Sequence, residues 1–87
     1  MNAIGMIETR GLTAAIEALD AMAKAANIKM TGFKKVGSGL VTVIIEGDVA
    51  AVSSAIEVGR QAHTQTGGEM ISSNVIPRPH PELSKIL

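Results

Sequence analysis

The sequence predicts an α+β fold of the ferredoxin-like kind, an antiparallel four-stranded sheet with two helices on one face. Three observations support this prediction. Segments with the two-residue period of strands alternate with two segments that have the three-and-four spacing of a helix. Two predicted strands near the middle of the chain are separated by only three residues, which is typical of a hairpin. The 87 residues leave room for a single domain, residues 1–87.

The first half of the chain predicts a strand, a helix and a hairpin. Residues 3–9 are apolar on both faces, which is typical of a central strand. Residues 28–36 and 40–46 have strand patterns and flank the turn 37–39. Between the first strand and the hairpin, helical spacing predicts one buried stripe: Leu12, Ala15, Ile16, Leu19, Met22, Ala23 and Ala26.

The second half repeats the order of a helix followed by a strand. Asp48 is well placed to cap the second helix, because its carboxylate can accept bonds from the free amides of the first turn. Gly67 and Gly68 can end that helix, and residues 69–76 predict the fourth strand. The expected buried stripe of the second helix is Val49, Val52, Ile56 and Gly59. Three prolines then end the sheet, and a short C-terminal helix is expected to bury Leu83, Ile86 and Leu87.

Composition excludes several functional classes. Acidic and basic residues balance at eight each, so no broad field favours a nucleic acid or an anionic membrane. Cysteine is absent, Phe33 is the only aromatic residue, and no apolar run approaches the ~20 residues of a membrane span. We therefore expect a cytoplasmic protein with neither nucleic-acid nor membrane partners. The apolar residues are weighted toward Ala, Val, Ile and Met and not toward large aromatics, which favours burial against copies of the same chain.

Catalysis finds little support in the sequence. His63 and His80 lack metal-ligand spacing and an obvious carboxylate partner, and the serines lack the context of a nucleophile. Glu8 and Arg10, near the end of the first strand, are better explained by an ion pair or a turn contact. We therefore expect neither an enzyme nor a bound cofactor or metal.

Two short segments have both a structural and a functional interpretation. The amides of residues 37–39 could cradle an anion, but a phosphate loop would be followed by a Lys, a hydroxyl and a helix. A hairpin turn is the better interpretation. Arg78 lies between two prolines that hold the backbone extended and aim the guanidinium outward, although a solvated terminal arginine explains it equally. Lys24, four residues after Asp20, is explained by an ordinary solvent-exposed face of the helix.

Five motifs in order resemble one known family. They are Ile7-Glu8-Thr9-Arg10-Gly11-Leu12, Ala14-Ala15-Ile16-Glu17-Ala18, Val36-Gly37-Ser38-Gly39-Leu40-Val41-Thr42-Val43, Gly47-Asp48-Val49 and Val75-Ile76-Pro77-Arg78-Pro79-His80. Along nearly its whole length the chain resembles the single-domain shell proteins of bacterial microcompartments, the BMC-domain family. Its departures are an Arg at position 10, where Lys is frequent, and a paired glycine before the last strand.

The resemblance implies a structural role. It implies a homohexamer with a central pore for selective diffusion of polar metabolites, and hexamers that meet each other and other shell proteins edge to edge around encapsulated enzymes. The implied location is the microcompartment shell in the cytoplasm. The residues implied to line the pore are Lys35, Val36, Gly37, Ser38 and Gly39. Those implied at the hexamer edge are Lys24, Asn27 and Arg78.

Two other classes of protein share this predicted scaffold. A regulatory module that binds a small molecule between subunits would need a specific polar pocket, which the sequence does not locate. A small hydrolase is disfavoured because no anion-binding loop with a suitably placed Arg and Asn is present.

Overall fold

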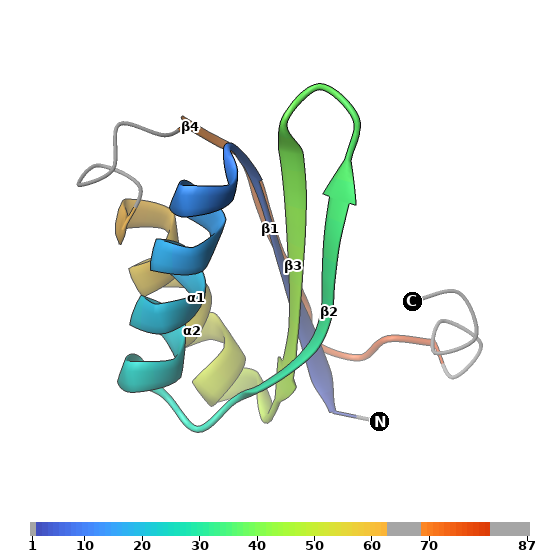
Figure 1. The fold of residues 1–87 in the computed structure, drawn as a ribbon. Coiled ribbons are helices and arrows are strands. Elements are labelled where there is room, and N and C mark those ends of the chain that lie inside the picture. Colours follow the sequence, from blue (N-terminus) through green and yellow to red (C-terminus); the bar gives the residue numbers. More distant parts are fainter. Residues whose placement is uncertain (1, 63–68, 81–87) are drawn as a thin grey trace.

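The computed structural model describes residues 2–62 and 69–80. Its elements follow the predicted order: β1 (Ala3–Arg10), α1 (Leu12–Ala25), β2 (Lys29–Val36), β3 (Leu40–Gly47), α2 (Val49–Ala62) and β4 (Glu69–Ile76). The strands form one antiparallel sheet in the order β2-β3-β1-β4, and both helices cover the same face (Figure 1). The ferredoxin-like prediction is thus confirmed. His63, the glycine pair 67–68 and the expected C-terminal helix lie outside the described residues.

The predicted central position of β1 is confirmed. This strand pairs with β3 on one side and β4 on the other, and its odd-numbered residues face the helices. Ile4 and Ile7, which point to opposite faces, have exposed fractions of 2% and 0%. A strand that is buried on both faces of its sheet needs apolar residues on both faces.

The core fills the space between the sheet and the helices. Its largest fully buried members include Ile7, Met22, Val43, Ile45 and Val52. Glycine permits the close approach of α2, because a Cβ at position 59 would lie 2.6 Å from Cδ1 of Ile7 and 2.8 Å from Cγ of Met22. Protein interiors are packed densely enough that such a contact would force a rearrangement.

The predicted buried stripes of both helices are partly wrong. Leu12 and Ile16, expected inside, are 40% and 52% exposed, and Ala23 is also exposed. Val49 of α2 is 49% exposed. The structure confirms the burial of five predicted residues, Ala15 and Met22 of α1 and Val52, Ile56 and Gly59 of α2, and it also buries Ala14, Ala18 and Ala55, which were not predicted. Small residues on the buried faces let the helices pack closely, so apolar volume alone does not identify these faces.

The strand register defines two ends of the sheet. At the hairpin end, Arg10 pairs with Leu40 and Glu69, beside the turn 37–39 and the start of α1. At the far end, Ala3 pairs with Gly47 and Ile4 pairs with Ile76. Because α1 runs back antiparallel to β1, its last turn and the connection to β2 lie at the far end (Figure 1).

Candidate functional site

The predicted hairpin turn is present, and it holds the expected pore residues at one end of the molecule. Gly37, Ser38 and Gly39 connect the paired residues Val36 and Leu40, and all three are exposed. Ser38 and Gly39 have φ angles of 68° and 78°. Glycine adopts this left-handed region freely, whereas Ser38 is strained there, so surrounding contacts must support the loop. Lys35 is exposed and Val36 is 49% exposed, so the side chains beside the turn are accessible.

Two contacts that support the hairpin loop come from the junction between β1 and α1. The amide of Gly11 donates to the carbonyl oxygen of Gly39 over 2.7 Å, and Nη1 of Arg10 donates to the carbonyl oxygen of Ser38 over 3.2 Å. Nε of Arg10 also lies 3.4 Å from Oε2 of Glu69 at the start of β4. Arg10 therefore makes both a turn contact and an ion pair, which were the two expectations for this position. The sequence alone did not identify Ser38 and Glu69 as the partners of Arg10.

The expected edge residues lie at the far end. Lys24 is in the last turn of α1, Asn27 is in the connection that follows it, and both are exposed. Nζ of Lys24 lies 2.9 Å from Oδ2 of Asp20. The hydrogen bond to Asp20, and then its charge, raise the pKa of Lys24 above its ordinary value of 10.5. The ammonium group therefore stays charged throughout the neutral range.

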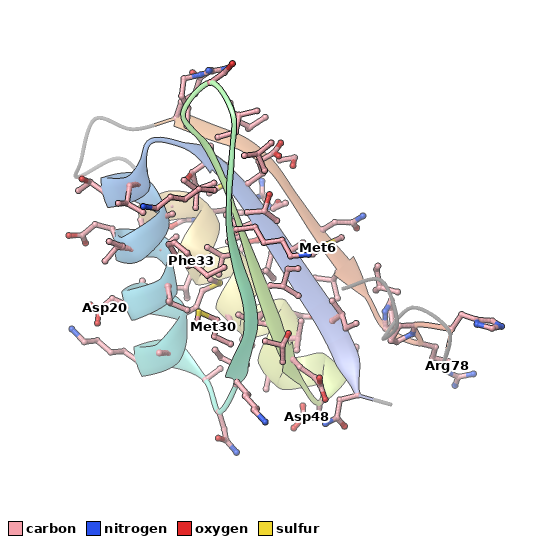
Figure 2. All side chains as sticks on the ribbon, turned by 45° about the vertical axis from the view of Figure 1, so that its right-hand side comes forward. Met6, Asp20, Met30, Phe33, Asp48 and Arg78 are labelled. Carbon is pink, nitrogen blue, oxygen red and sulfur yellow. The ribbon has the colours of Figure 1, made fainter. Side chains whose placement is uncertain are left out.

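Arg78 follows β4 and is exposed between Pro77 and the buried Pro79. The described residues contain no ion-pair partner for it. Figure 2 shows Arg78 on the side of the molecule opposite Asp20, the partner of Lys24. A single chain therefore does not bring the Lys24 and Arg78 side chains together, although both belong to the far end of the sheet.

Side chains of the described residues line two open hollows on the surface. One, of about 670 Å³, lies between α1 and α2 and includes Asp20, Lys24 and Val58 in its walls. The other, of about 310 Å³, lies on the face of the sheet that the helices leave open. Its lining residues are Met6, Glu8, Thr42, Ser72, Ser73 and Asn74. Glu8 there accepts a 3.4 Å hydrogen bond from the Thr42 hydroxyl.

The described residues show no arrangement for metal chemistry. Within 2–62 and 69–80, no group of three His, Cys, Asp or Glu side chains could hold a metal ion. None of the helices in the same ranges is long and apolar enough to cross a membrane. The geometry therefore directs attention to the hairpin loop and the far end.

Comparison with known proteins identifies the family. Residues 3–79 match the model of the BMC domain. The chain is 56% identical over 86 residues to the bacterial microcompartment shell protein PduA of Citrobacter freundii, a match that covers 99% of this chain and 91% of that protein. It is 54% identical to EutM, a bacterial microcompartment shell protein of Salmonella typhimurium, with 99% and 88% covered. It is 48% identical to the carboxysome shell protein CcmK2 of a Synechocystis species, with 98% and 84% covered.

A solved structure gives the same result. The crystal structure of a microcompartment protein from Desulfitobacterium hafniense superposes with a TM-score of 0.84 at 35% identity. The match covers 95% of this chain but only 44% of the other, so this chain spans less than half of that protein's length. Both the sequence and the architecture therefore place the chain in the BMC-domain family of bacterial microcompartment shell proteins.

Proposed function

We propose that six copies of this chain form a ring with their hairpin loops at the centre, and that the far ends join neighbouring rings into a shell. Membership of the BMC-domain family makes the chain a structural protein of a microcompartment shell, which assembles with other shell proteins and is not an enzyme. The number of copies, the pore and the enclosed enzymes are parts of the proposal. So is the assignment of all 87 residues to one shell domain.

The observation that supports this arrangement best is the separation of the two candidate sites. The hairpin loop and the far end lie at opposite ends of strands that are eight residues long, or about 26 Å. The longest dimension of the chain is 35 Å. A subunit of a ring needs one end at the axis and the other at the rim, and this elongated sheet provides both.

The sides of the subunit offer apolar surface to neighbours in the ring. Large apolar side chains remain exposed on both helices and on both edge strands, β2 and β4. Edge strands with such side chains are ordinarily covered by another chain. The exposed residues are Leu12, Ile16, Met30, Val36, Val49, Val58 and Ile71. We therefore expect an isolated subunit to be poorly stable at low concentration.

The rim contacts follow from the positions of the edge residues. Because Lys24 and Arg78 lie on opposite sides of one chain, a contact that uses both must combine different copies. The methylene stem of Lys24 can pack against its two-fold mate while the ammonium group reaches carbonyl oxygens. Pro77 and Pro79 preorganise Arg78, which lowers the entropy lost when it enters a pocket beside Asn27 of the next ring.

The centre of the ring would be a polar passage. Six loops would place Ser38 hydroxyls, loop amides and Lys35 ammonium groups around the axis. Such groups offer hydrogen bonds and positive potential to hydroxylated or anionic metabolites, while a volatile aldehyde gains less from them. The subunit would thus control which small molecules reach the enclosed enzymes without performing chemistry on them.

Native mass spectrometry, followed by electron microscopy at rising protein concentration, tests this proposal. We expect six copies of the 9.0 kDa chain, then flat sheets or tubes as the concentration rises. A stable dimer or trimer that never tiles would contradict the proposal. It would instead favour the regulatory module, with the hollow on the open sheet face as its candidate pocket.

A further inference from the structure

Most of the edge strand β4 lacks the charged side chains that protect the other edge of the sheet. β2 carries Lys29, Lys34 and Lys35, and lysines on an edge strand discourage another strand from pairing with it. In β4, residues 70–76 include no charged residue and neither glycine nor proline. An uncharged segment of this kind on an exposed edge readily adds a strand from another chain. β4 therefore needs protection of a different kind.

The amide of Val75 has such protection. Its N–H donates a 2.9 Å hydrogen bond to Oδ1 of Asn74, the preceding residue. In an antiparallel ladder, residues whose N–H and C=O groups face the neighbouring strand alternate with residues whose groups face away from it. Because Val75 donates to a side chain of its own strand, it is one of the residues that face away from β1. Oδ1 of Asn74 thus occupies the position that a carbonyl oxygen of an added strand would take.

The regular part of β4 offers few other outward amides. Ile71 has no partner in β1, because the pairing register shifts beside it. An unpaired residue of this kind bends the strand and disrupts the outward row of N–H and C=O groups. Pro77, which has no N–H, follows the last residue of the strand. Between these two residues, alternation leaves only Ser73 and Val75 facing outward, so Asn74 removes one of two donors.

We propose that Asn74 is a guard residue that keeps β2 of a second copy from adding to β4. The four strands alternate in direction across the sheet, so its two edges, β2 and β4, are antiparallel to each other. Two copies in the same orientation would therefore present antiparallel edges, and β2 of one copy could extend the sheet of the other. The lysines of β2 repel a second β2 but not the uncharged part of β4.

The guard selects how copies of the chain associate. Strand addition between β4 and β2 is a heterologous contact that leaves the same two edges free at the ends, so it continues into a fibre unless its rotation closes a ring. With strand addition blocked, copies associate through side chains, and the exposed apolar residues of both edge strands, such as Val36 and Ile71, provide the surface. The guard is a property of each subunit and does not depend on the number of copies in the proposed ring.

Three proteins test the role of Asn74: the unmodified chain as the baseline, Asn74→Val and the control Ser72→Val. Both substitutions place valine at an exposed position of β4, and the two-residue period puts the two positions on the same face. They therefore add similar apolar surface and similar strand propensity. Only Asn74→Val removes the acceptor of the Val75 amide.

Hydrogen exchange followed by NMR tests whether the side chain protects the edge. Exchange of the Val75 amide should be about fivefold faster in Asn74→Val than in Ser72→Val, the effect expected for the loss of one hydrogen bond. Equal exchange rates in the two variants would show that Asn74 does not protect this amide and would overturn the proposal.

Fibre growth tests strand addition itself. Each added copy gains about one more hydrogen bond in Asn74→Val, so its fibres should appear at a protein concentration about fivefold lower than those of Ser72→Val. Thioflavin T binding and a reflection at about 4.7 Å, the spacing of paired strands, distinguish these fibres from shell sheets. Equal threshold concentrations would show that added apolar surface alone drives association, and would overturn the proposal. Either result is independent of whether six copies form a ring.

Discussion

The amide of Gly11 donates a 2.7 Å hydrogen bond to the carbonyl oxygen of Gly39, which joins the start of α1 to the hairpin loop. The carbonyl oxygen of Gly11 also accepts a bond from the amide of Ala15, in the first turn of α1. Gly11 thus connects the helix to the loop through its backbone alone. Its φ of 104° and ψ of 136° are accessible to glycine but not to residues with a Cβ.

Gly11→Ala should destabilise the protein by about 1–3 kcal/mol, although nothing lies within 4 Å of the added methyl group. The cause is backbone strain and not a clash. Gly37→Ala is the matched control, because its Cβ also meets open space and its φ is not in the positive range. It should change stability by about 1 kcal/mol or less. Urea unfolding at one protomer concentration measures both, and equal effects would refute the strain argument.

Gly59→Ala should destabilise the core by about 1–3 kcal/mol through overpacking. The new methyl group would lie 2.6 Å from Cδ1 of Ile7, an atom that Ile7→Val removes. The double variant should therefore be about 1 kcal/mol more stable than the sum of the single effects predicts. In the control cycle, Ile45→Val replaces Ile7→Val, and the effects should add. Additivity in both cycles would show that Ile7 does not limit the approach of α2.

Local signals in the sequence were sufficient to predict the strands. Residues 69–76 form β4 as predicted, because glycines before them and Pro77 after them mark both ends of the period-two pattern. The Asp48 cap is also confirmed, since its Oδ1 accepts a 2.9 Å bond from the amide of Ala51. Such features depend on residues close in sequence, which is why the pattern alone identifies them.

The helix faces and the loop contacts depend on tertiary structure. Leu12 and Ile16 have the spacing of buried residues, yet the alanines beside them pack inside because they allow a closer approach. Arg10 and Glu69 are far apart in sequence, and only the register between β1 and β4 makes them neighbours. Likewise, the separation of the loop from Asn27 and Arg78 is a consequence of topology. No short motif encodes these relationships.

Asp20→Asn should lower the pKa of Lys24, because Asp20 supplies both the hydrogen bond and the main charge that raise it. Glu17→Gln should lower it less, since Glu17 acts only through a weaker charge interaction. NMR titration of the Lys24 side chain would rank the two variants, and an equal or larger shift in Glu17→Gln would contradict the ion pair as the cause.

The raised pKa of Lys24 also determines how the stability of the protein changes with pH. The pKa of Lys24 is higher in the folded chain than in the unfolded chain. The stability that charged Lys24 contributes is therefore fully present below the unfolded pKa, and it is lost as the pH rises through the folded pKa. Any dependence of unfolding on the deprotonation of Lys24 is therefore confined to pH above about 10.5. Unfolding curves of Asp20→Asn should match the unmodified chain in shape between pH 6 and 9, and a change centred there would require a different titrating group.

Lys24→Ala and Arg78→Ala should leave the ring intact but impair the formation of sheets, because both side chains belong to the proposed rim and neither is buried. Lys34→Ala removes an exposed lysine that lies away from the far end and should tile normally. Native mass spectrometry reports the ring, and electron microscopy reports the sheets. Wild-type tiling by either rim variant would show that its side chain is not an edge contact.

Ser38→Leu should reduce the passage of a polar solute through assembled shells without unfolding the subunit. The larger side chain would narrow the proposed pore, because Ser38 is exposed on its loop, and leucine lacks the hydroxyl proposed to bind solutes. Ser38→Ala is the matched control, because it meets the same positive φ and also lacks the hydroxyl but adds no bulk.

Together, the two variants distinguish the effect of side-chain size at position 38 from the effect of losing the hydroxyl. Flux that falls in Ser38→Leu alone indicates steric narrowing, whereas a fall in both indicates a loss of hydrogen bonding by the Ser38 hydroxyl. Both results require solutes to pass the hairpin loops. Unchanged flux in shells of Ser38→Leu would place the route elsewhere, for example at the junctions between rings, and would remove Ser38 from the pore.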